Sequence, residues 1–97
     1  MSLGVYFLAM VKFTPKIRSR IRWYIKKHFP LARNQSVIED DSPLLTSGII
    51  DSMGVLDLMT FIEKEFKIAI SDEDLLPENF ETIASMASFI LSKKTAN

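Results

Sequence analysis

The chain has 97 residues, which is enough for one domain and too few for two ordinary ones. Hydrophobic residues make up 47 % and charged residues 25 %, so the composition is that of a folded globular domain and excludes wholesale disorder. No cysteine is present, which rules out disulfides, thiolate metal sites and a cysteine nucleophile. Because His28 is the only histidine, a metal centre or a Ser-His-Asp arrangement has little support, and we expect no enzyme.

The formal net charge of zero hides two opposite parts of the chain. Residues 1–38 hold eight Lys and Arg and no acid, which gives a charge of +8. Residues 39–97 hold four Lys against twelve Asp and Glu, which gives −8. Such an asymmetry within one domain indicates a partner of definite charge.

Residues 1–13 are expected to form an apolar N-terminal leader. Its uncharged stretch, residues 3–11, is about half as long as the roughly 18 residues that a membrane span needs, so we expect no span. A secretory signal carries basic residues before its apolar stretch, whereas here they follow it, which indicates a cytoplasmic protein. Met10 opens a second start-like sequence, so two interpretations of residues 1–9 stay open: part of the domain, or an upstream start.

The hydrophobic pattern predicts a domain at residues 14–94 with three main helices and one short one, followed by a tail at 95–97. The first helix is expected at about 15–29, with Thr14 as N-cap and Pro15 as its first residue. The others are expected at about 52–66, 72–76 and 82–93, with Pro77 ending the short one. The core-facing stripes are Ile17, Ile21, Tyr24, Ile25, His28 and Phe29, then Val55, Leu58, Met59, Ile62 and Phe66, then Ile83, Met86, Ala87, Ile90 and Leu91.

Two segments outside these stripes also receive predictions. The long connection 30–50 has no period, and its apolar residues are expected to hold it on the core: Val37, Ile38, Leu44, Leu45, Ile49 and Ile50. Trp23 falls off the stripe of the first helix. We predict that the leader residues Val5, Tyr6, Phe7 and Leu8 fold back on this indole.

The most informative segment is residues 48–54, GIIDSMG, because it delivers Ser52 to the start of an acidic amphipathic helix. Asp51 suits a helix cap, and its charge suits the helix dipole. Ser52 lacks a Glu three residues on for a capping box, and Gly54 in the first turn costs about 1 kcal/mol relative to Ala. Small residues beside Ser52 indicate room for a group attached to its hydroxyl.

The same helix carries apolar residues that the core does not need. Met53 and Leu56 lie off its apolar stripe, next to Asp57 and close to Glu63. Exposed apolar side chains rimmed by acids indicate a small surface on which partners dock.

Taken together, residues 15–93 resemble the acyl carrier protein family, including its peptidyl and D-alanyl carriers. The resemblance is carried by Asp51-Ser52-Met53, similar to the family's Asp-Ser-Leu, and by the preceding Leu44, Leu45, Gly48 and Ile49. The helix end EKEFKIAI (63–70) and the stretch DEDLLPENF (72–80) look like those of stand-alone carriers served by a separate adenylating ligase. The resemblance implies an all-α fold, an acyl-carrier-like bundle of three main helices plus one short helix.

The resemblance also implies a function and the residues that perform it. Ser52 would receive a 4′-phosphopantetheine arm from coenzyme A through a magnesium-using phosphopantetheinyl transferase, with Asp51, Met53 and Gly54 flanking the attachment. The chain would then be a monomeric phosphoprotein that shuttles acyl or aminoacyl thioesters from the ligase to downstream acyl-using enzymes of fatty acid or secondary metabolite biosynthesis. These partners would meet Met53, Leu56, Asp57 and Glu63, and no metal ligands are implied.

Two other interpretations of the basic first helix stay open. A basic helix with Trp23 on its polar side is typical of a small nucleic-acid binder, but twelve acids elsewhere would repel phosphate, so we expect no nucleic acid. Alternatively, the leader and Trp23 enter a membrane interface while Lys and Arg meet anionic lipid, which would be a weak peripheral contact.

Overall fold

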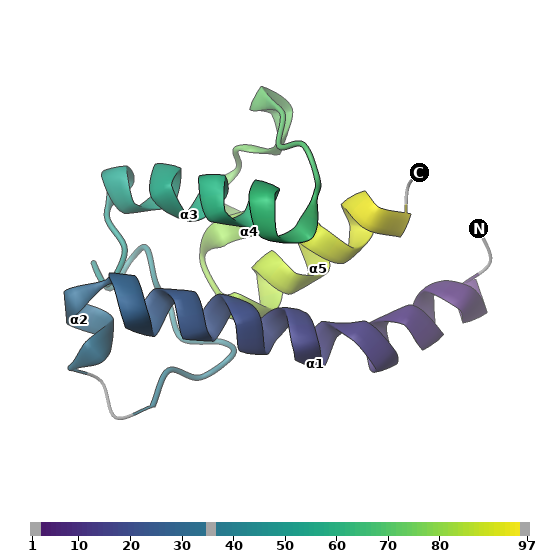
Figure 1. Ribbon diagram of the computed structural model, residues 1–97, viewed down its shortest axis with the longest axis horizontal. Helices are drawn as coiled ribbons and strands as arrows, with labels where there is room; N and C mark the ends of the chain where they lie inside the picture. The colour runs from purple at the N-terminus through teal and green to yellow at the C-terminus, as the bar shows by residue number, and fades with distance from the viewer. Residues whose placement is uncertain (1–2, 35–36, 96–97) are drawn as a thin grey trace.

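Helices account for all the regular secondary structure in the residues that the computed structural model describes, 3–34 and 37–95 (Figure 1). The long helices are α1 (Leu3–His28), α3 (Ser52–Phe66) and α5 (Ile83–Thr95). The short elements are α2 (Pro30–Arg33), the 3-10 turn η1 (Asp72–Asp74) and α4 (Pro77–Phe80). The expected all-α fold is confirmed. Residues 1–2 of the leader and 96–97 of the expected tail lie outside the described residues.

The core forms where the apolar stripes of the three long helices meet. α1 packs along α5, and α3 lies across the bundle from α1 (Figure 1). Most of the predicted stripe is buried, whereas Tyr24 is half-buried and His28 is exposed and stacks on the Tyr24 ring at 4.2 Å. The buried core residues of the long helices are Ile17, Ile21, Ile25, Phe29, Leu58, Ile62, Phe66, Ile83, Met86, Ala87, Phe89 and Ile90.

The first helix begins at Leu3 and not near residue 15, so the leader is its first three turns. Pro15 therefore lies inside α1, where its ring nitrogen cannot donate to the carbonyl four residues earlier. Thr14 is not an N-cap: it is buried, and its hydroxyl accepts a hydrogen bond from Arg18 Nη1 at 3.0 Å. The Thr-Pro pair that is typical of a helix start is here used inside a helix.

The predicted contact between the leader and Trp23 is wrong. Phe7 and Trp23 are sixteen residues apart on one helix, a separation of about 24 Å at 1.5 Å per residue. Phe7 is 64 % exposed and Leu8 is 68 % exposed, and the side chains of Val5 and Tyr6 lie outside the described part of the structure. The indole instead lies between two cations, with Arg20 Cζ 4.8 Å and Lys27 Nζ 4.9 Å from its ring centre.

The segments between the long helices differ from the prediction at four places. Pro30 begins the short helix α2, and Val37, expected on the core, is exposed, while Ile38, Leu44 and Ile50 are buried as expected. The helix expected at 72–76 is the 3-10 turn η1, followed by Leu75 and Leu76 in non-helical conformations. Pro77 begins α4 and does not end a helix, because proline is well suited to the first helical position.

The position of Pro15 inside α1 leads to a prediction about stability. Pro15→Ala should raise the free energy of unfolding in urea by up to about 3 kcal/mol, because Ala restores the missing N–H and removes the ring clash. The matched control is Pro77→Ala at the first position of α4, where the N–H has no intrahelical acceptor and little should change. Equal effects of the two substitutions would contradict a helix that continues through Pro15.

Candidate functional site

Ser52 is the first residue of α3, and the turn before it fixes its position. Asp51 is the N-cap in an extended conformation, and its Oδ1 accepts a hydrogen bond from the Gly54 N–H at 2.7 Å. The Val55 N–H donates to the Asp51 carbonyl at 3.0 Å and so begins the helical ladder. Ser52 itself is exposed. Its hydroxyl therefore stands at the positive end of a fifteen-residue helix, where a negatively charged group is stabilised.

Gly54 is required by packing, which gives a different reason for this residue from the one that the sequence suggested. A Cβ at this position would lie 2.5 Å from Phe29 Cε1 and 3.1 Å from Ile50 Cγ2. The missing side chain lets the first turn of α3 rest on the buried ring of Phe29. Gly54 thus holds the start of α3 close to α1 and does not leave space beside Ser52.

Two open hollows meet at Ser52. One has a volume of about 370 Å³ and lies against the loop before α3, where Gly48, Ile50 and Asp51 contribute to its wall. The other has a volume of about 270 Å³, lies between α3 and the segment joining η1 to α4, and is lined by Leu45, Ser52, Val55, Leu56, Met59, Leu75, Leu76, Pro77 and Phe80. Ser52 is the only polar residue in this second lining, which is an apolar groove starting at the hydroxyl.

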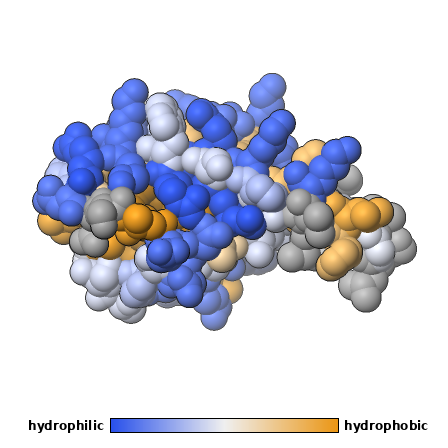
Figure 2. Space-filling view, turned by 90° about the horizontal axis from the view of Figure 1, so that it is seen from below, coloured by the Kyte–Doolittle hydropathy of each residue, from blue (hydrophilic) through white to orange (hydrophobic). Residues whose placement is uncertain are grey.

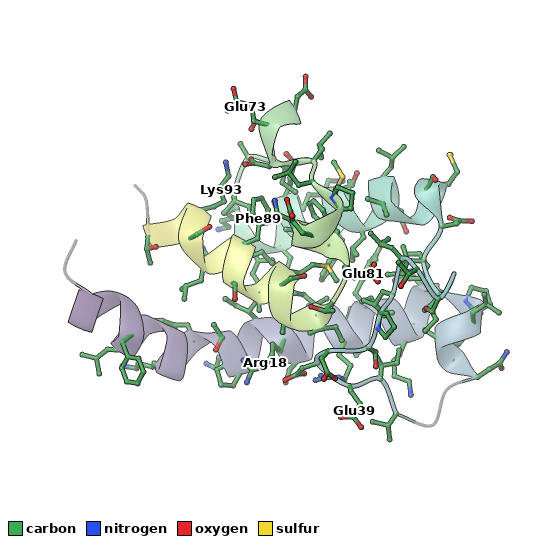
Figure 3. The ribbon with its side chains drawn as sticks, turned by 180° about the vertical axis from the view of Figure 1, so that it is seen from behind. Arg18, Glu39, Glu73, Glu81, Phe89 and Lys93 are labelled. Carbon is green, nitrogen blue, oxygen red and sulfur yellow. The ribbon has the colours of Figure 1, made fainter. Side chains whose placement is uncertain are left out.

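The loop that carries Ser52 is held by Glu81, a residue that the sequence analysis did not single out. The Glu81 carboxylate accepts hydrogen bonds from the backbone N–H of Leu45 at 3.0 Å and from the hydroxyl of Thr46 at 2.6 Å. Its backbone carbonyl accepts from the Leu44 N–H at 2.8 Å. Figure 3 shows Glu81 at the junction of α4 and α5, beside this loop. A lone Glu 35 residues away along the chain offers no signal in the sequence.

A second carboxylate, that of Asp40, holds the earlier part of the same connection on α1. Arg18 Nε lies 3.0 Å from Asp40 Oδ2, and Arg22 pairs with the other carboxylate oxygen. Arg22 Nε also donates to the Ile38 carbonyl at 2.9 Å, and the Ala84 N–H donates to the Asp40 carbonyl at 2.9 Å. Part of the positive charge of α1 is therefore paired with an acidic side chain of the same molecule.

The residues predicted to meet partners lie on more than one side of α3. Met53 is 73 % exposed and Leu56 is 55 % exposed, and Leu56 borders the apolar groove. Asp57 is exposed on the side toward α1, where it accepts a hydrogen bond from the Tyr24 hydroxyl at 3.0 Å. Burial, together with this hydrogen bond and the charge of Asp57, raises the pKa of Tyr24 above its ordinary value.

Glu63 has a partner within the chain. It is half-buried, and its Oε2 accepts a hydrogen bond from the Ile70 N–H at 2.9 Å. This bond spans the turn after α3, where Lys67 has the left-handed conformation that ends the helix. The contact gives Glu63 a role in closing the turn.

The far wall of the groove is fastened at η1. The Asp74 carboxylate accepts hydrogen bonds from the backbone and the hydroxyl of Ser71 and forms an ion pair of 2.7 Å with Lys93 of α5 (Figure 3 labels Lys93). The contact with Lys93, followed by the backbone bond from Ser71, lowers the pKa of Asp74. These bonds hold Leu75 and Leu76 opposite α3.

Neither a metal centre nor a membrane span is found in the described part of the chain. Within residues 3–34 and 37–95, no three His, Asp or Glu side chains are grouped so that they could hold a metal ion. No helix in these ranges combines the length and the apolar character needed to cross a bilayer.

The geometry is that of a helical domain that displays one serine at a helix start beside an apolar groove, and comparison with known proteins identifies its class. The family described as "Phosphopantetheine attachment site" matches residues 31–90, more than half of the chain. The chain therefore belongs to this family of carrier proteins. The matched domain is of the carrier class, and its cofactor is 4′-phosphopantetheine.

Two curated proteins are similar to this chain. "Probable acyl carrier protein PigG" of Serratia sp. (strain ATCC 39006) is 32 % identical over 53 residues, which cover 55 % of this chain and 61 % of PigG. "Aminoacyl carrier protein 2" of Bradyrhizobium diazoefficiens (strain JCM 10833 / BCRC 13528 / IAM 13628 / NBRC 14792 / USDA 110) is 32 % identical over 56 residues, 58 % of this chain and 62 % of that protein. The chain thus spans about three fifths of the length of the curated relatives it matches.

The contact between Gly54 and Phe29 can be tested directly. Gly54→Ala should lower the free energy of unfolding by about 1–2 kcal/mol, because overpacking against a buried ring outweighs the roughly 1 kcal/mol gained in helix propensity. The control is Gly4→Ala in α1, where a Cβ has nothing within 4 Å and stability should stay equal or rise. Urea unfolding measures both, and a stabilised Gly54→Ala variant would contradict the packing role.

Proposed function

We propose that Ser52 is the residue that carries the 4′-phosphopantetheine arm. The observation that supports it is the exposed Ser52 hydroxyl at the first position of α3, inside the segment that matches the attachment-site family. In the transfer, Ser52 Oγ replaces the 3′,5′-ADP part of coenzyme A at phosphorus, and the hydroxyl proton passes to the transferase. The chain contributes an exposed hydroxyl and a helix end that stabilises the new negative charge.

The arm supplies a thiol for thioester chemistry, which this chain cannot supply because it has no cysteine. Its cargo in our proposal is an acyl or aminoacyl group, since one relative is named an acyl carrier and the other an aminoacyl carrier. The apolar residues Leu56, Met59 and Leu76 beside Ser52 provide a surface along which the bound group can lie. An adenylating ligase would load the carrier, and downstream acyl-using enzymes would receive the cargo.

Attachment at Ser52 can be measured by intact mass spectrometry. The protein is incubated with coenzyme A, magnesium and a phosphopantetheinyl transferase of broad specificity, and one arm per chain is expected. Ser52→Ala should gain none, because the hydroxyls at the start of α5, those of Thr82 and Ser85, are half-buried and already hydrogen-bonded within the first turn of that helix. Ser47→Ala, which changes an exposed serine of the preceding loop, is the matched control and should be modified like the wild type. A labelled Ser52→Ala variant would show that the assignment is wrong.

We further propose that the transferase and the ligase dock on the exposed side of α3 next to Ser52. Met53 and Leu56 would be the apolar anchors, and Asp57 would meet a basic residue of the partner. Glu63 belongs to the same predicted surface, but its bond to the Ile70 N–H makes Asp57 the better test of charge. Acids at the edge of an interface mainly accelerate the encounter, so loading should slow as salt rises.

The charge of Asp57 is the testable part of this surface. Asp57→Lys should lower the loading rate about tenfold, equivalent to about 1.4 kcal/mol, by reversing the attraction to a basic partner. Tyr24→Phe removes the hydrogen bond to Asp57 without changing charge, and Glu78→Lys reverses an exposed acid of α4. Both controls should load at nearly the wild-type rate in a stopped-time assay. Equal losses for Asp57→Lys and Glu78→Lys would show a general charge effect and place the interface elsewhere.

A further inference from the structure

One face of α1 takes part neither in the core nor in the candidate site around Ser52. At 100° per residue, the buried residues Ile17, Ile21 and Ile25 define the inward side of α1. The opposite side holds exposed residues within an arc of about 100°. These residues, which we call the outer face, are Leu8, Lys12, Lys16, Ser19, Trp23 and Lys27.

The outer face has cations along its length and no acid. Residues 1–38 contain no Asp or Glu, so the outer face carries only positive charge. Figure 2 shows hydrophilic side chains along α1 and hydrophobic residues toward the end where α1 begins. The face is also long, because the rise of 1.5 Å per residue from Leu8 to Lys27 gives about 29 Å, compared with the 41 Å extent of the molecule. A flat, negatively charged partner could contact all of it at once.

Apolar side chains are set among and beyond these cations. Trp23 is 46 % exposed on the outer face, with its ring between Arg20 and Lys27. Leu8 is 68 % exposed on the same face. Phe7 falls at the angle of the core stripe but is 64 % exposed, because the start of α1 projects beyond the other helices (Figure 1). The uncharged residues 3–11 therefore form an apolar end on a cationic helix.

We propose that the outer face of α1 docks on an anionic lipid surface. Lipid headgroups accept lysines, and the interface accepts a tryptophan ring and short apolar helix ends at the same depth. A nucleic acid would attract the lysines but would gain nothing from the exposed Leu8. In this orientation α3 lies on the side of α1 away from the bilayer, so Ser52 stays accessible to enzymes (Figure 1). The proposal stands on α1 alone and does not depend on the role of Ser52.

Vesicle binding tests the proposal with the full chain. Trp23 is the only tryptophan and lies on the outer face, so its emission reports the contact without a label. With vesicles of phosphatidylglycerol and phosphatidylcholine, the protein should co-sediment and its emission should shift to shorter wavelength. Phosphatidylcholine alone should bind it much less, and salt near 1 M, where the Debye length is about 3 Å, should release it.

Paired variants separate the outer face from net charge and from general hydrophobicity. Lys16→Gln with Lys27→Gln should weaken the partition coefficient about 30-fold, about 2 kcal/mol, because each lysine near an anionic surface contributes about fivefold. Lys64→Gln with Lys67→Gln makes the same charge change on exposed residues of α3 and its C-cap and should have little effect. Leu8→Ser should reduce binding, whereas Leu31→Ser, which changes an exposed leucine of α2, should not.

Several results would overturn the proposal. Failure of the wild type to sediment with anionic vesicles would do so, as would equal losses in the two lysine pairs. Sedimentation with an unchanged Trp23 emission would place the lipid contact elsewhere. Concentration-dependent dimers that are lost in Leu8→Ser, without vesicle binding, would assign the face to a second copy. Tight binding of a DNA duplex without vesicle binding would assign it to nucleic acid.

Discussion

The position of Ser52 depends on a carboxylate that is distant in the sequence. The loop before α3 has almost no regular structure, yet it must present one serine at a fixed place. The Glu81 carboxylate accepts hydrogen bonds from two backbone N–H groups and one hydroxyl of this loop. Leu44 and Ile50 anchor the ends of the loop in the core. Because hydrogen bonds to a charged group are stronger than neutral ones, a single side chain can replace the ladder that a regular element would provide.

The basic residues of α1 have two roles, one for the arginines and another for the lysines. Arg18 and Arg22 hold Asp40, and Arg20 contacts Glu65 of α3 through two hydrogen bonds of 3.1 and 3.2 Å. The planar guanidinium group suits such two-point contacts, whereas the ammonium group of lysine is well hydrated on a flexible stem. The arginines accordingly connect α1 to the acidic part of the chain, and Lys12, Lys16 and Lys27 remain on the outer face.

The sequence predicts the core residues that depend on the helical period. It does not predict contacts between residues that are far apart in the chain. The stripes of α3 and α5 follow from the helical period, whereas the burial of Ile38, Leu44 and Ile50 follows from their apolar character alone. The start of α1 is not predicted, because Thr14-Pro15 has the local chemistry of a helix start. In the structure the buried Thr14 hydroxyl instead accepts a hydrogen bond from Arg18. Ser52 is predicted as the attachment residue from its neighbours in the chain. Glu81 and the packing reason for Gly54 are not predicted, since their partners Thr46 and Phe29 are far away in sequence.

The candidate site depends on one helix, α3, whose side chains point in four different directions. Successive residues of α3 point about 100° apart, so Leu58 reaches the core, Leu56 the groove, Asp57 the side of α1, and Met53 solvent. Gly54 and Phe29 fix the rotation of the helix about its axis at the end where this division begins. A change in that rotation would turn Ser52 away from the groove and Met53 away from solvent together. In the proposed function, access to the Ser52 hydroxyl and display of Met53 are therefore set by the same contact, which would tie attachment of the arm to recognition by the enzymes that use it.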